Sequence, residues 1–449
     1  MSTMAAGATL SLLVLLLITS SSSSGAASSP GGSCSVPPDG GSTLRIIHAF
    51  GPCSPLRPAA PLPSWADFLS AQSARDDSRL LYLSSLAATA GRRSFVPLAP
   101  GRQLLQIPNY VVRAGLGFPP QTLLLALDNS NDAAWVPCSS CAGCPPASPS
   151  FSPAKSSTFR TVPCGSPACS QVPAPSCSPA NSCSFNMSYG GSSLLAGLVQ
   201  DSLSLAADVV PSYTFGCLQR VTGSSAPPQG LLGLGRGPLS FLSQTQNLYG
   251  GTFSYCLPSF KSLNFSGTLR LGPKGQPQRI KTTPLLANPH RPSLYYVNMT
   301  GVRVGRRVLP IPPSALAFDP ATGAGTVVDA GTMFTRLAPP AYAALRDEFR
   351  RRVRAPLAPP LGGFDTCYNV SIAPAPAVTF LFDGAAVTLP EDNVLIHSTA
   401  GTITCLAMAA APDGLNAVLN VIANMQQQNH RVLFDVPNAR VGFAREMCT

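Results

Sequence analysis

Two aspartates, Asp128 and Asp329, each follow a short apolar run with the composition of a buried strand. Glycine and small polar residues come after both acids, which predicts a turn at the end of each strand. Two carboxylates held face to face share one proton, because like charges in contact cannot both ionise cheaply. The ionised member can activate a water molecule while the neutral member supplies a proton. Hydrolysis of a peptide bond requires this combination.

The segments that must position these acids occur twice. Asp329 lies 201 residues after Asp128 (329 − 128). Each acid is followed later by two apolar residues and a small one, Leu231-Leu-Gly233 and Val421-Ile-Ala423, which are 190 residues apart (423 − 233). Two signals with nearly the same offset indicate a duplicated lobe rather than a solenoid of short repeats.

The composition indicates an all-β protein with two lobes. The chain has 449 residues, of which 45% are hydrophobic and 11% charged, and it contains 47 prolines and 38 glycines. That length suits two lobes, and the many turn-forming residues favour short strands over long helices. One helix is expected at residues 339–355, where proline opens the segment and apolar residues fall on one face.

The N-terminal part differs in composition from the rest. Residues 10–18 are apolar and precede a serine run, so residues 1–27 are predicted to be a signal peptide. Residues 28–95, rich in Ser, Ala and Pro, are interpreted as a removable prosegment; an ordinary N-terminal subdomain is the alternative. The β-lobes are then expected at residues 96–285 and 286–449. No later stretch reaches membrane length, so no membrane anchor is predicted.

Cysteines and glycosylation sequons indicate an oxidising, secretory route. The chain has 14 cysteines, seven of them in residues 138–183, and Asn-x-Ser/Thr sequons at Asn186, Asn264, Asn298 and Asn369. Secretion to the apoplast or cell wall is the expected localisation. A zinc site at Cys138, Cys141 and Cys144 is the weaker alternative to disulfides. Cys367 and Cys405 are expected to pair in the C-terminal lobe.

The formal net charge is +11, but the basic residues are not interleaved with aromatics as a nucleic-acid groove requires. No nucleic acid is therefore expected as a partner. The densest basic run is Arg350-Arg-Arg352 with Arg354, on the expected helix. Its two interpretations are a solvated helix face and a contact with an anionic surface.

From Asn109 to Cys448 the chain resembles the pepsin-like aspartic proteases, and among them the plant nepenthesin- and nucellin-like group. The motifs that carry this resemblance are Asp128-Asn-Ser130 with Ala134-Trp-Val-Pro137, Asp329-Ala-Gly-Thr332, Tyr189-Gly-Gly-Ser192, Gly230-Leu-Leu-Gly-Leu-Gly235, Asn420-Val-Ile-Ala-Asn-Met-Gln-Gln-Gln428 and the cysteine-rich residues 138–183.

The resemblance implies a secreted monomeric endopeptidase, made as a zymogen and active at acidic pH on protein or peptide substrates, without cofactor or metal. Asp128 and Asp329 would form the catalytic dyad. Tyr189 and Gly190 would belong to a flap over the substrate, and Trp135 would hydrogen-bond the flap tyrosine. Thr332 would hydrogen-bond the carboxylate of Asp329 and favour its ionised form.

Five positions depart from the family pattern. Two of them, Ser130 and Asn131, stand where glycine and a hydroxyl residue are common, although the plant group often has Ser at the first. The family has a hydroxyl residue after each catalytic Asp, which bonds across to the other lobe; here these positions hold Asn129 and Ala330. Ala423 occupies a position where glycine is usual. These departures predict a braced but weakened site. They also motivate an alternative function, a non-catalytic relative that binds or inhibits other proteins such as cell-wall hydrolases.

Overall fold

The computed structural model describes residues 93–101, 105, 107–260, 262, 266–361, 363–370, 374–397, 402–412 and 418–448. The chain divides into a first unit, residues 1–69, and a second unit, residues 70–449. The predicted signal peptide and all but the last three residues of the predicted prosegment lie outside the described residues.

The strands up to the middle of the chain are β1 (Ser94–Pro100), β2 (Tyr110–Leu116), β3 (Gln121–Asp128), β4 (Trp135–Ala142), β5 (Arg160–Thr161), β6 (Ser176–Cys177), β7 (Cys183–Tyr189), β8 (Ser192–Leu205), β9 (Asp208–Thr222), β10 (Leu231–Gly233), β11 (Thr252–Cys256), β12 (Gly267–Leu271), β13 (Lys281–Leu286) and β14 (Tyr296–Val297). Those that follow are β15 (Met299–Val304), β16 (Arg307–Val308), β17 (Gly325–Val328), β18 (Thr335–Leu337), β19 (Leu357–Ala358), β20 (Cys367–Tyr368), β21 (Val378–Phe382), β22 (Ala385–Thr388), β23 (Leu395–His397), β24 (Thr404–Leu406), β25 (Met408–Ala410), β26 (Leu419–Ile422), β27 (His430–Asp435) and β28 (Arg440–Arg445).

The helices are short apart from one. They are α3 (Phe241–Gln244), α4 (Gln246–Tyr249), α5 (Pro339–Arg352) and α6 (Asn424–Gln427), with 3-10 turns at Pro153–Lys155, Cys169–Gln171, Pro313–Ala315 and Glu391–Asn393. The all-β expectation is confirmed. The one predicted helix forms and ends three residues earlier than expected, with Tyr342, Leu345 and Phe349 buried.

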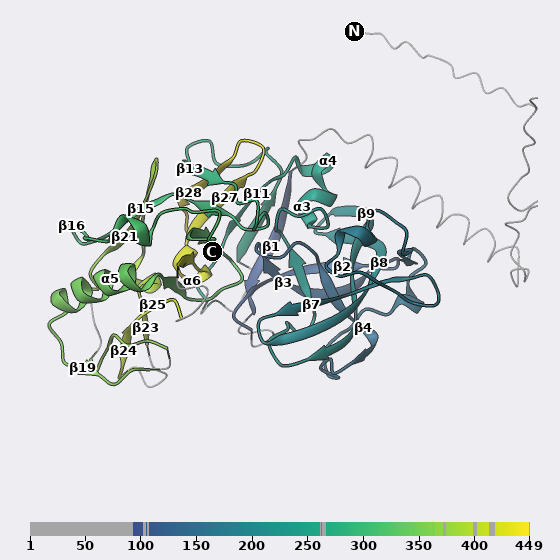
Figure 1. Cartoon of the computed structure of the whole chain (residues 1–449), viewed down its shortest axis with the longest axis horizontal. Helices are drawn as coiled ribbons and strands as arrows, with labels where there is room; N and C mark the ends of the chain where they lie inside the picture. Colours follow the sequence, from purple (N-terminus) through teal and green to yellow (C-terminus); the bar gives the residue numbers. More distant parts are fainter. Residues whose placement is uncertain are drawn as a thin grey trace, which may run out of the picture. The chain divides into compact units, whose positions relative to one another are not determined.

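Six antiparallel strands join the two halves of the chain. Their order is β1-β12-β11-β27-β28-β13, so strands from the beginning, middle and end of the described chain lie side by side (Figure 1). At the junction of the two halves, Phe253 of β11 pairs with Phe434 of β27. Their rings stack with centroids 4.7 Å apart. The connection between the lobes is therefore a continuous hydrogen-bonded sheet.

Each aspartate strand pairs in parallel with the strand of its later apolar motif. β3 pairs with β10, with Asp128 opposite Gly233, and β17 pairs with β26, with Val328 opposite Ile422. Strands covered on both faces favour continuous apolar runs, which explains the sequence pattern before each acid. The two halves repeat the same local arrangement, as the sequence offsets predicted.

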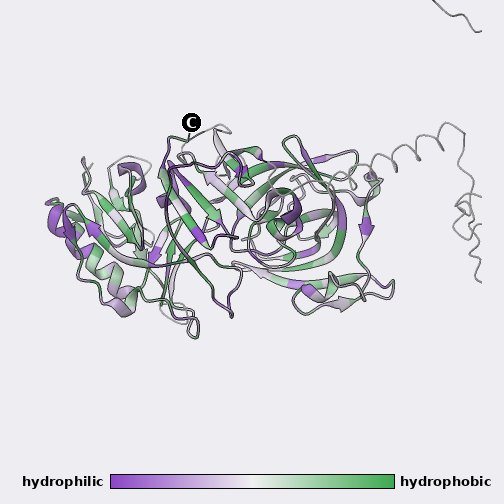
Figure 2. Ribbon diagram, turned by 90° about the horizontal axis from the view of Figure 1, so that it is seen from above, coloured by the Kyte–Doolittle hydropathy of each residue, from purple (hydrophilic) through white to green (hydrophobic). Residues whose placement is uncertain are grey.

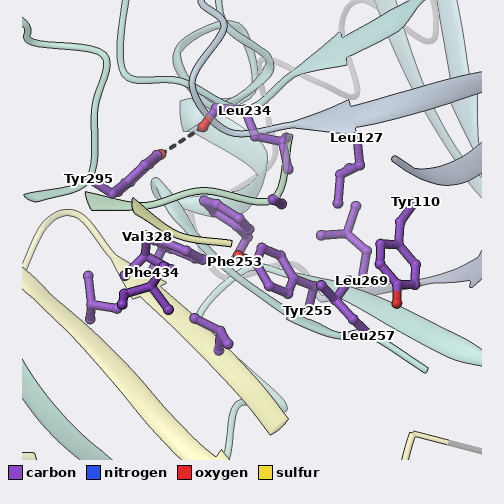
Figure 3. Close-up of a cluster of buried hydrophobic side chains, with 14 of the residues drawn as sticks. Tyr110, Leu127, Leu234, Phe253, Tyr255, Leu257, Leu269, Tyr295, Val328 and Phe434 are labelled. Atoms are coloured by element: carbon purple, nitrogen blue, oxygen red, sulfur yellow. Dashed lines mark hydrogen bonds between the residues drawn. The ribbon is translucent and has the colours of Figure 1, made fainter. Parts of the chain in front are cut away.

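The residues before the two acids are buried in one apolar cluster. Leu127 precedes Asp128 and Val328 precedes Asp329, and their side chains are 0% and 1% exposed. Figure 3 shows Val328 beside Phe434, with Leu127 on the opposite side of the same cluster. The hydroxyl of Tyr295 in this cluster donates to the carbonyl of Leu234 at 2.7 Å. Packing in this core therefore fixes the ends of both aspartate strands.

The twelve described cysteines form six disulfides. They pair as Cys138–Cys217, Cys141–Cys144, Cys164–Cys177, Cys169–Cys183, Cys256–Cys448 and Cys367–Cys405. The last pair confirms the one connectivity expected from the sequence. Cys138, Cys141 and Cys144, considered above as a zinc site, are all in disulfides. Within the described ranges, no helix has the length and apolar character needed to cross a bilayer.

Candidate active site

Asp128 is the last residue of β3, and its side chain is 3% exposed. Its Oδ1 accepts hydrogen bonds from the backbone N–H of Ser130 at 2.8 Å and from the Ser130 hydroxyl at 2.7 Å. An aspartate that accepts from the N–H two residues on forms a tight local turn. Ser130 stands where the family often has glycine, and here its hydroxyl holds the carboxylate.

Asp329 directly follows β17 and repeats this turn. Its Oδ1 accepts from the N–H of Gly331 at 3.1 Å, and its Oδ2 accepts from the hydroxyl of Thr332 at 2.5 Å. The backbone N–H of Asp329 donates to Ile422 in the neighbouring strand at 3.0 Å. Thr332 thus lies where the sequence predicted it, bonded to the carboxylate.

The turn after Asp329 lies directly against the carboxylate of Asp128. A methyl group on the Cα of Gly331 would lie 2.6 Å from Oδ2 and 2.8 Å from Cγ of Asp128, which is too close for any residue with a side chain. Glycine permits this approach. The turn that carries Asp329 therefore lies against Asp128, which precedes Asp329 by 201 residues in the sequence.

The electrostatic environment favours a proton on the pair. Burial, followed by the negative charge of Asp128, raises the pKa of Asp329 to about 6. The hydrogen bonds from Thr332 and Gly331 act in the opposite direction but are weaker. In mildly acidic solution Asp329 holds a proton, so the pair can offer both an acid and a base.

Asn129 crosses to the second turn with both ends of its side chain. Its Nδ2 donates to the carbonyl of Val328 at 2.9 Å, and its Oδ1 accepts from the N–H of Ala330 at 2.7 Å. Asn129 is 1% exposed, so both bonds are shielded from water. The amide of Asn129 thus supplies both the donor and the acceptor that a hydroxyl would supply. Ala330 has no polar side chain and forms no such bond to the first turn.

Two further buried asparagines hold the same turn. Asn424 donates from Nδ2 to the carbonyl of Ala330 at 3.0 Å and to that of Pro108 at 3.2 Å. Asn109 donates from Nδ2 to the carbonyl of Gly331 at 3.3 Å. Both are at most 3% exposed. The sequence reasoning assigned neither a role in the site. The only signal in the sequence for Asn109 was its place just before an apolar strand. The only signal for Asn424 was its place within the motif at residues 420–428.

The departure at Ala423 does not disturb the site. Its backbone has φ −88° and ψ 171°, an extended conformation that every residue type adopts, so glycine is not required there. Its N–H donates to the hydroxyl of Thr335 at 3.0 Å. Close by, Gln427 donates from Nε2 to the carbonyl of Asp329 at 3.0 Å. The segment around Ala423, next to the second acid, is therefore held by hydrogen bonds without a glycine.

Tyr189 ends the first strand of a hairpin made by β7 and β8. Tyr189 pairs with Ser192 across a two-residue Gly-Gly turn, and Gly190 has φ +53°, which suits glycine. The hydroxyl of Tyr189 accepts from Nδ2 of Asn109 at 3.3 Å. Burial and the charge of Asp128 raise the pKa of Tyr189, so it stays a neutral phenol. The hairpin is therefore present at the predicted position, and the charges of both acids act on its tyrosine.

Trp135 contacts Tyr189 in a way that differs from the expectation. The two rings meet edge to face, with centroids 5.6 Å apart and planes at 71°. The indole N–H of Trp135 is buried and has no hydrogen-bond partner within the described part of the chain. The Tyr189 hydroxyl, the expected partner, accepts a hydrogen bond from Asn109. Trp135 therefore supports the flap by ring packing.

Within the described residues, no group of three or more His, Cys, Asp and Glu side chains is arranged to hold a metal ion.

Comparisons with known proteins agree with this arrangement. Residues 110–273 match the family model described as xylanase inhibitor N-terminal, and residues 294–445 match the one described as xylanase inhibitor C-terminal. The chain is 52% identical to Aspartyl protease AED3 of Arabidopsis thaliana over 417 residues, which cover 92% of this chain and 93% of that protein.

Two more distant likenesses extend the comparison. Aspartic proteinase nepenthesin-1 of Nepenthes gracilis is 34% identical over 76% of this chain and 78% of its own. The crystal structure of an aspartic proteinase from Irpex lacteus matches with a TM-score of 0.58 and 18% identity, covering 80% of this chain and 98% of that one. The last likeness concerns the fold alone. The chain therefore belongs to the plant pepsin-like aspartic proteases, with the bilobal all-β fold of that family, and is an aspartic-type endopeptidase.

Proposed function

We propose that this protein is a secreted endopeptidase, made as a zymogen, in which Asp128 and Asp329 activate a water molecule at acidic pH. The observation that carries the proposal is the close approach of the two acids: Gly331 lies against Asp128, and the charge of Asp128 helps to raise the pKa of Asp329.

The proposed reaction follows from these protonation states. Asp128 takes a proton from water, whose oxygen attacks the carbonyl carbon of the scissile peptide bond. Asp329 gives its proton to the carbonyl oxygen, which becomes a hydroxyl of the tetrahedral intermediate. Asp128 then gives its proton to the nitrogen as the C–N bond breaks, while a hydroxyl of the intermediate returns its proton to Asp329, so the pair again shares one proton. Tyr189 and Gly190 would close over the substrate and exclude bulk water.

Zymogen processing is proposed to end near the pair Arg92-Arg93. Strand β1 begins at Ser94 and pairs with β12 from Ser94 opposite Leu271 to Leu98 opposite Gly267. A cut inside β1 would disrupt its pairing with both β12 and β2. We therefore place the end of the prosegment at residue 93, two residues before the boundary expected from composition, with the lobes at residues 94–285 and 286–449.

Secretion is proposed from the six disulfides and from the sequons. Asn186 and Asn369 are exposed, and Asn298 is partly exposed, so the described sequons are open to glycosylation. Disulfides of this density form in the secretory pathway rather than in the cytosol. The protein is proposed to act as a monomer on protein and peptide substrates outside the cell.

A second candidate function is binding to another protein without cleavage. It is favoured by Ala330, which lacks the bracing hydroxyl, and by the family models, whose descriptions name xylanase inhibitors. The three asparagine amides that hold the second turn argue for the first candidate, since they keep the acids in place.

The test is expression of the full chain with its own leader in plant cells, followed by acidification of the secreted protein and assay on a denatured protein substrate. The proposal predicts release of the N-terminal segment and cleavage that pepstatin blocks. An Asp128→Asn variant should be processed and secreted no more efficiently than the parent protein. It should not cleave the substrate. Tight, cleavage-free binding to a glycosidase that survives loss of both acids would favour the second candidate.

A further inference from the structure

Five arginines from two segments meet on one surface of the C-terminal half. Arg306 and Arg307 lie on the β15–β16 hairpin, and Arg351, Arg352 and Arg354 lie at and just beyond the C-terminal end of α5. All five are exposed. In Figure 1 α5 and β16 lie at the left-hand end, and Figure 2 shows strongly hydrophilic ribbon at that end. We call these five residues the arginine surface.

A single buried acid pairs with three of the five arginines. Glu348, whose side chain is 6% exposed, pairs with Arg351 at 2.6 Å, with Arg352 at 2.7 Å and with Arg307 at 3.6 Å. Arg352 also packs on the hairpin turn, where a methyl group on Gly305 would lie 2.7 Å from one of its terminal nitrogens. The surface is thus built around Glu348 and does not consist of unrelated side chains.

The charges of this surface do not cancel. Five guanidinium groups face one carboxylate, which leaves a net charge of +4 (5 − 1). The other acids of the region, Asp347 and Asp365, pair with Arg346 and Arg350, two further basic residues of α5. Hydrogen bonds from Arg351 and Arg352 lower the pKa of Glu348, so the balance also holds in mildly acidic solution.

We propose that the arginine surface binds an acidic polysaccharide, a polymer whose uronate carboxylates accept hydrogen bonds from the guanidinium groups. Guanidinium forks match carboxylates in two-pronged geometry, and a row of fixed positive charges suits a polymer with repeated negative charges. The choice of an extracellular polymer rests on the proposed secretion. The surface itself is independent of the dyad.

Polysaccharide is favoured over single-stranded nucleic acid because the surface offers no aromatic platform. Bases are held by stacking on exposed aromatic rings. Among the described residues, the exposed large aromatics are Phe95 and Phe118, neither of which lies on α5, β15 or β16. Double-stranded DNA needs no such platform and is therefore included in the test.

The test compares two variants that remove four positive charges each. In the first, Arg306, Arg307, Arg351 and Arg354 are changed to Gln, while Arg352 stays to pair with Glu348. In the matched control, Arg160, Arg220, Arg279 and Arg291, which are exposed elsewhere on the described chain, are changed to Gln. Binding of the mature glycoprotein to polygalacturonate, fully methyl-esterified polygalacturonate and double-stranded DNA is measured at low and high NaCl.

The proposal predicts that the first variant binds polygalacturonate at least about tenfold more weakly, whereas the control changes the Kd by less than about twofold. Binding should weaken with salt and should be absent for the neutral methyl ester. Peptide cleavage should be unchanged in both variants, which separates this proposal from the proposed function. Equal losses in the two variants, equal binding of the methyl ester, or tighter binding of DNA than of polygalacturonate would overturn it.

Discussion

Asn129 and Ala330, which follow the two acids, are joined by a hydrogen bond of 2.7 Å from the backbone N–H of Ala330 to Oδ1 of Asn129. The same amide donates to the carbonyl of Val328 at 2.9 Å. A residue on the first turn therefore fixes the backbone on both sides of Asp329. Only the first turn supplies a side chain to this brace, because Ala330 lacks the hydroxyl found in the family. Asn109 and Asn424 support the second turn instead.

Replacing Asn129 by Ala should lower kcat on the order of 100-fold with little change in KM, because a shift of the second turn by about 1 Å misplaces Asp329 relative to Asp128. Steady-state kinetics on a peptide substrate measure this. Asn129→Thr is the matched control, since a hydroxyl can also donate and accept, and it should retain most of the activity. A kcat for Asn129→Ala within about threefold of the parent would mean that the brace is not needed.

Ala330→Ser restores the hydroxyl position found in the family. We expect it to raise kcat by less than about threefold, because Asn129, Asn424 and Asn109 already hold this turn by buried bonds worth about 1 kcal/mol each. The comparison is made on folded protein, verified by circular dichroism. A gain of more than about tenfold would show instead that the site is under-braced.

The raised pKa of Asp329 predicts that part of the stability is lost as pH rises. Its pKa is about 6 in the folded protein and 3.8 without the fold, so the protonated form stabilises the native state. The contribution is complete below about pH 4 and disappears as pH rises through about 6, amounting to about 3 kcal/mol.

Urea unfolding of the mature protein and of Asp329→Asn between about pH 4 and pH 7.5 measures this contribution. The parent-minus-variant difference in unfolding free energy should fall by about 3 kcal/mol over this range. Effects of the Asp329→Asn change that do not depend on pH, such as the lost bond to Thr332, cancel when the difference is compared between pH values. A difference that does not vary with pH would show that Asp329 is not the group with the raised pKa.

Asn109 links the flap to the second turn, since its Nδ2 donates to the Tyr189 hydroxyl and to the Gly331 carbonyl. Asn109→Ala and Tyr189→Phe should each lower kcat/KM by about five- to tenfold. In the double variant, the Asn109 change should cost much less than it does alone, because its partner hydroxyl is already gone. Effects that multiply in full would show that the two side chains act independently.

The sequence was sufficient to predict what depends on local pattern. Apolar runs ending in Asp128 and Asp329 predicted the two strand-and-turn units, and the repeated apolar pairs predicted a duplicated arrangement that appears as two parallel strand pairs. The pairing of Cys367 with Cys405 was also predicted. For the strand-and-turn units and the duplication, the signal lies within a few residues or in a repeat.

The amide contacts could not be predicted, because they depend on side-chain geometry between distant segments. Asn109 and Gly331 are 222 residues apart, and Asn424 and Pro108 are 316 apart. No pattern around Asn109 distinguishes it from an ordinary polar residue before a strand. A contact of Trp135 with Tyr189 was expected as a hydrogen bond, whereas the structure shows edge-to-face packing of the two rings, which depends on side-chain geometry.

The most direct measurement is the dependence of kcat/KM on pH for peptide cleavage by the mature protein and its Asp128→Asn variant. If two buried acids share one proton, cleavage should be strong below about pH 6, should fall as Asp329 loses its proton above that value, and should drop on the order of 1,000-fold in the variant. Cleavage that persists unchanged into alkaline solution, or that survives Asp128→Asn, would contradict the account.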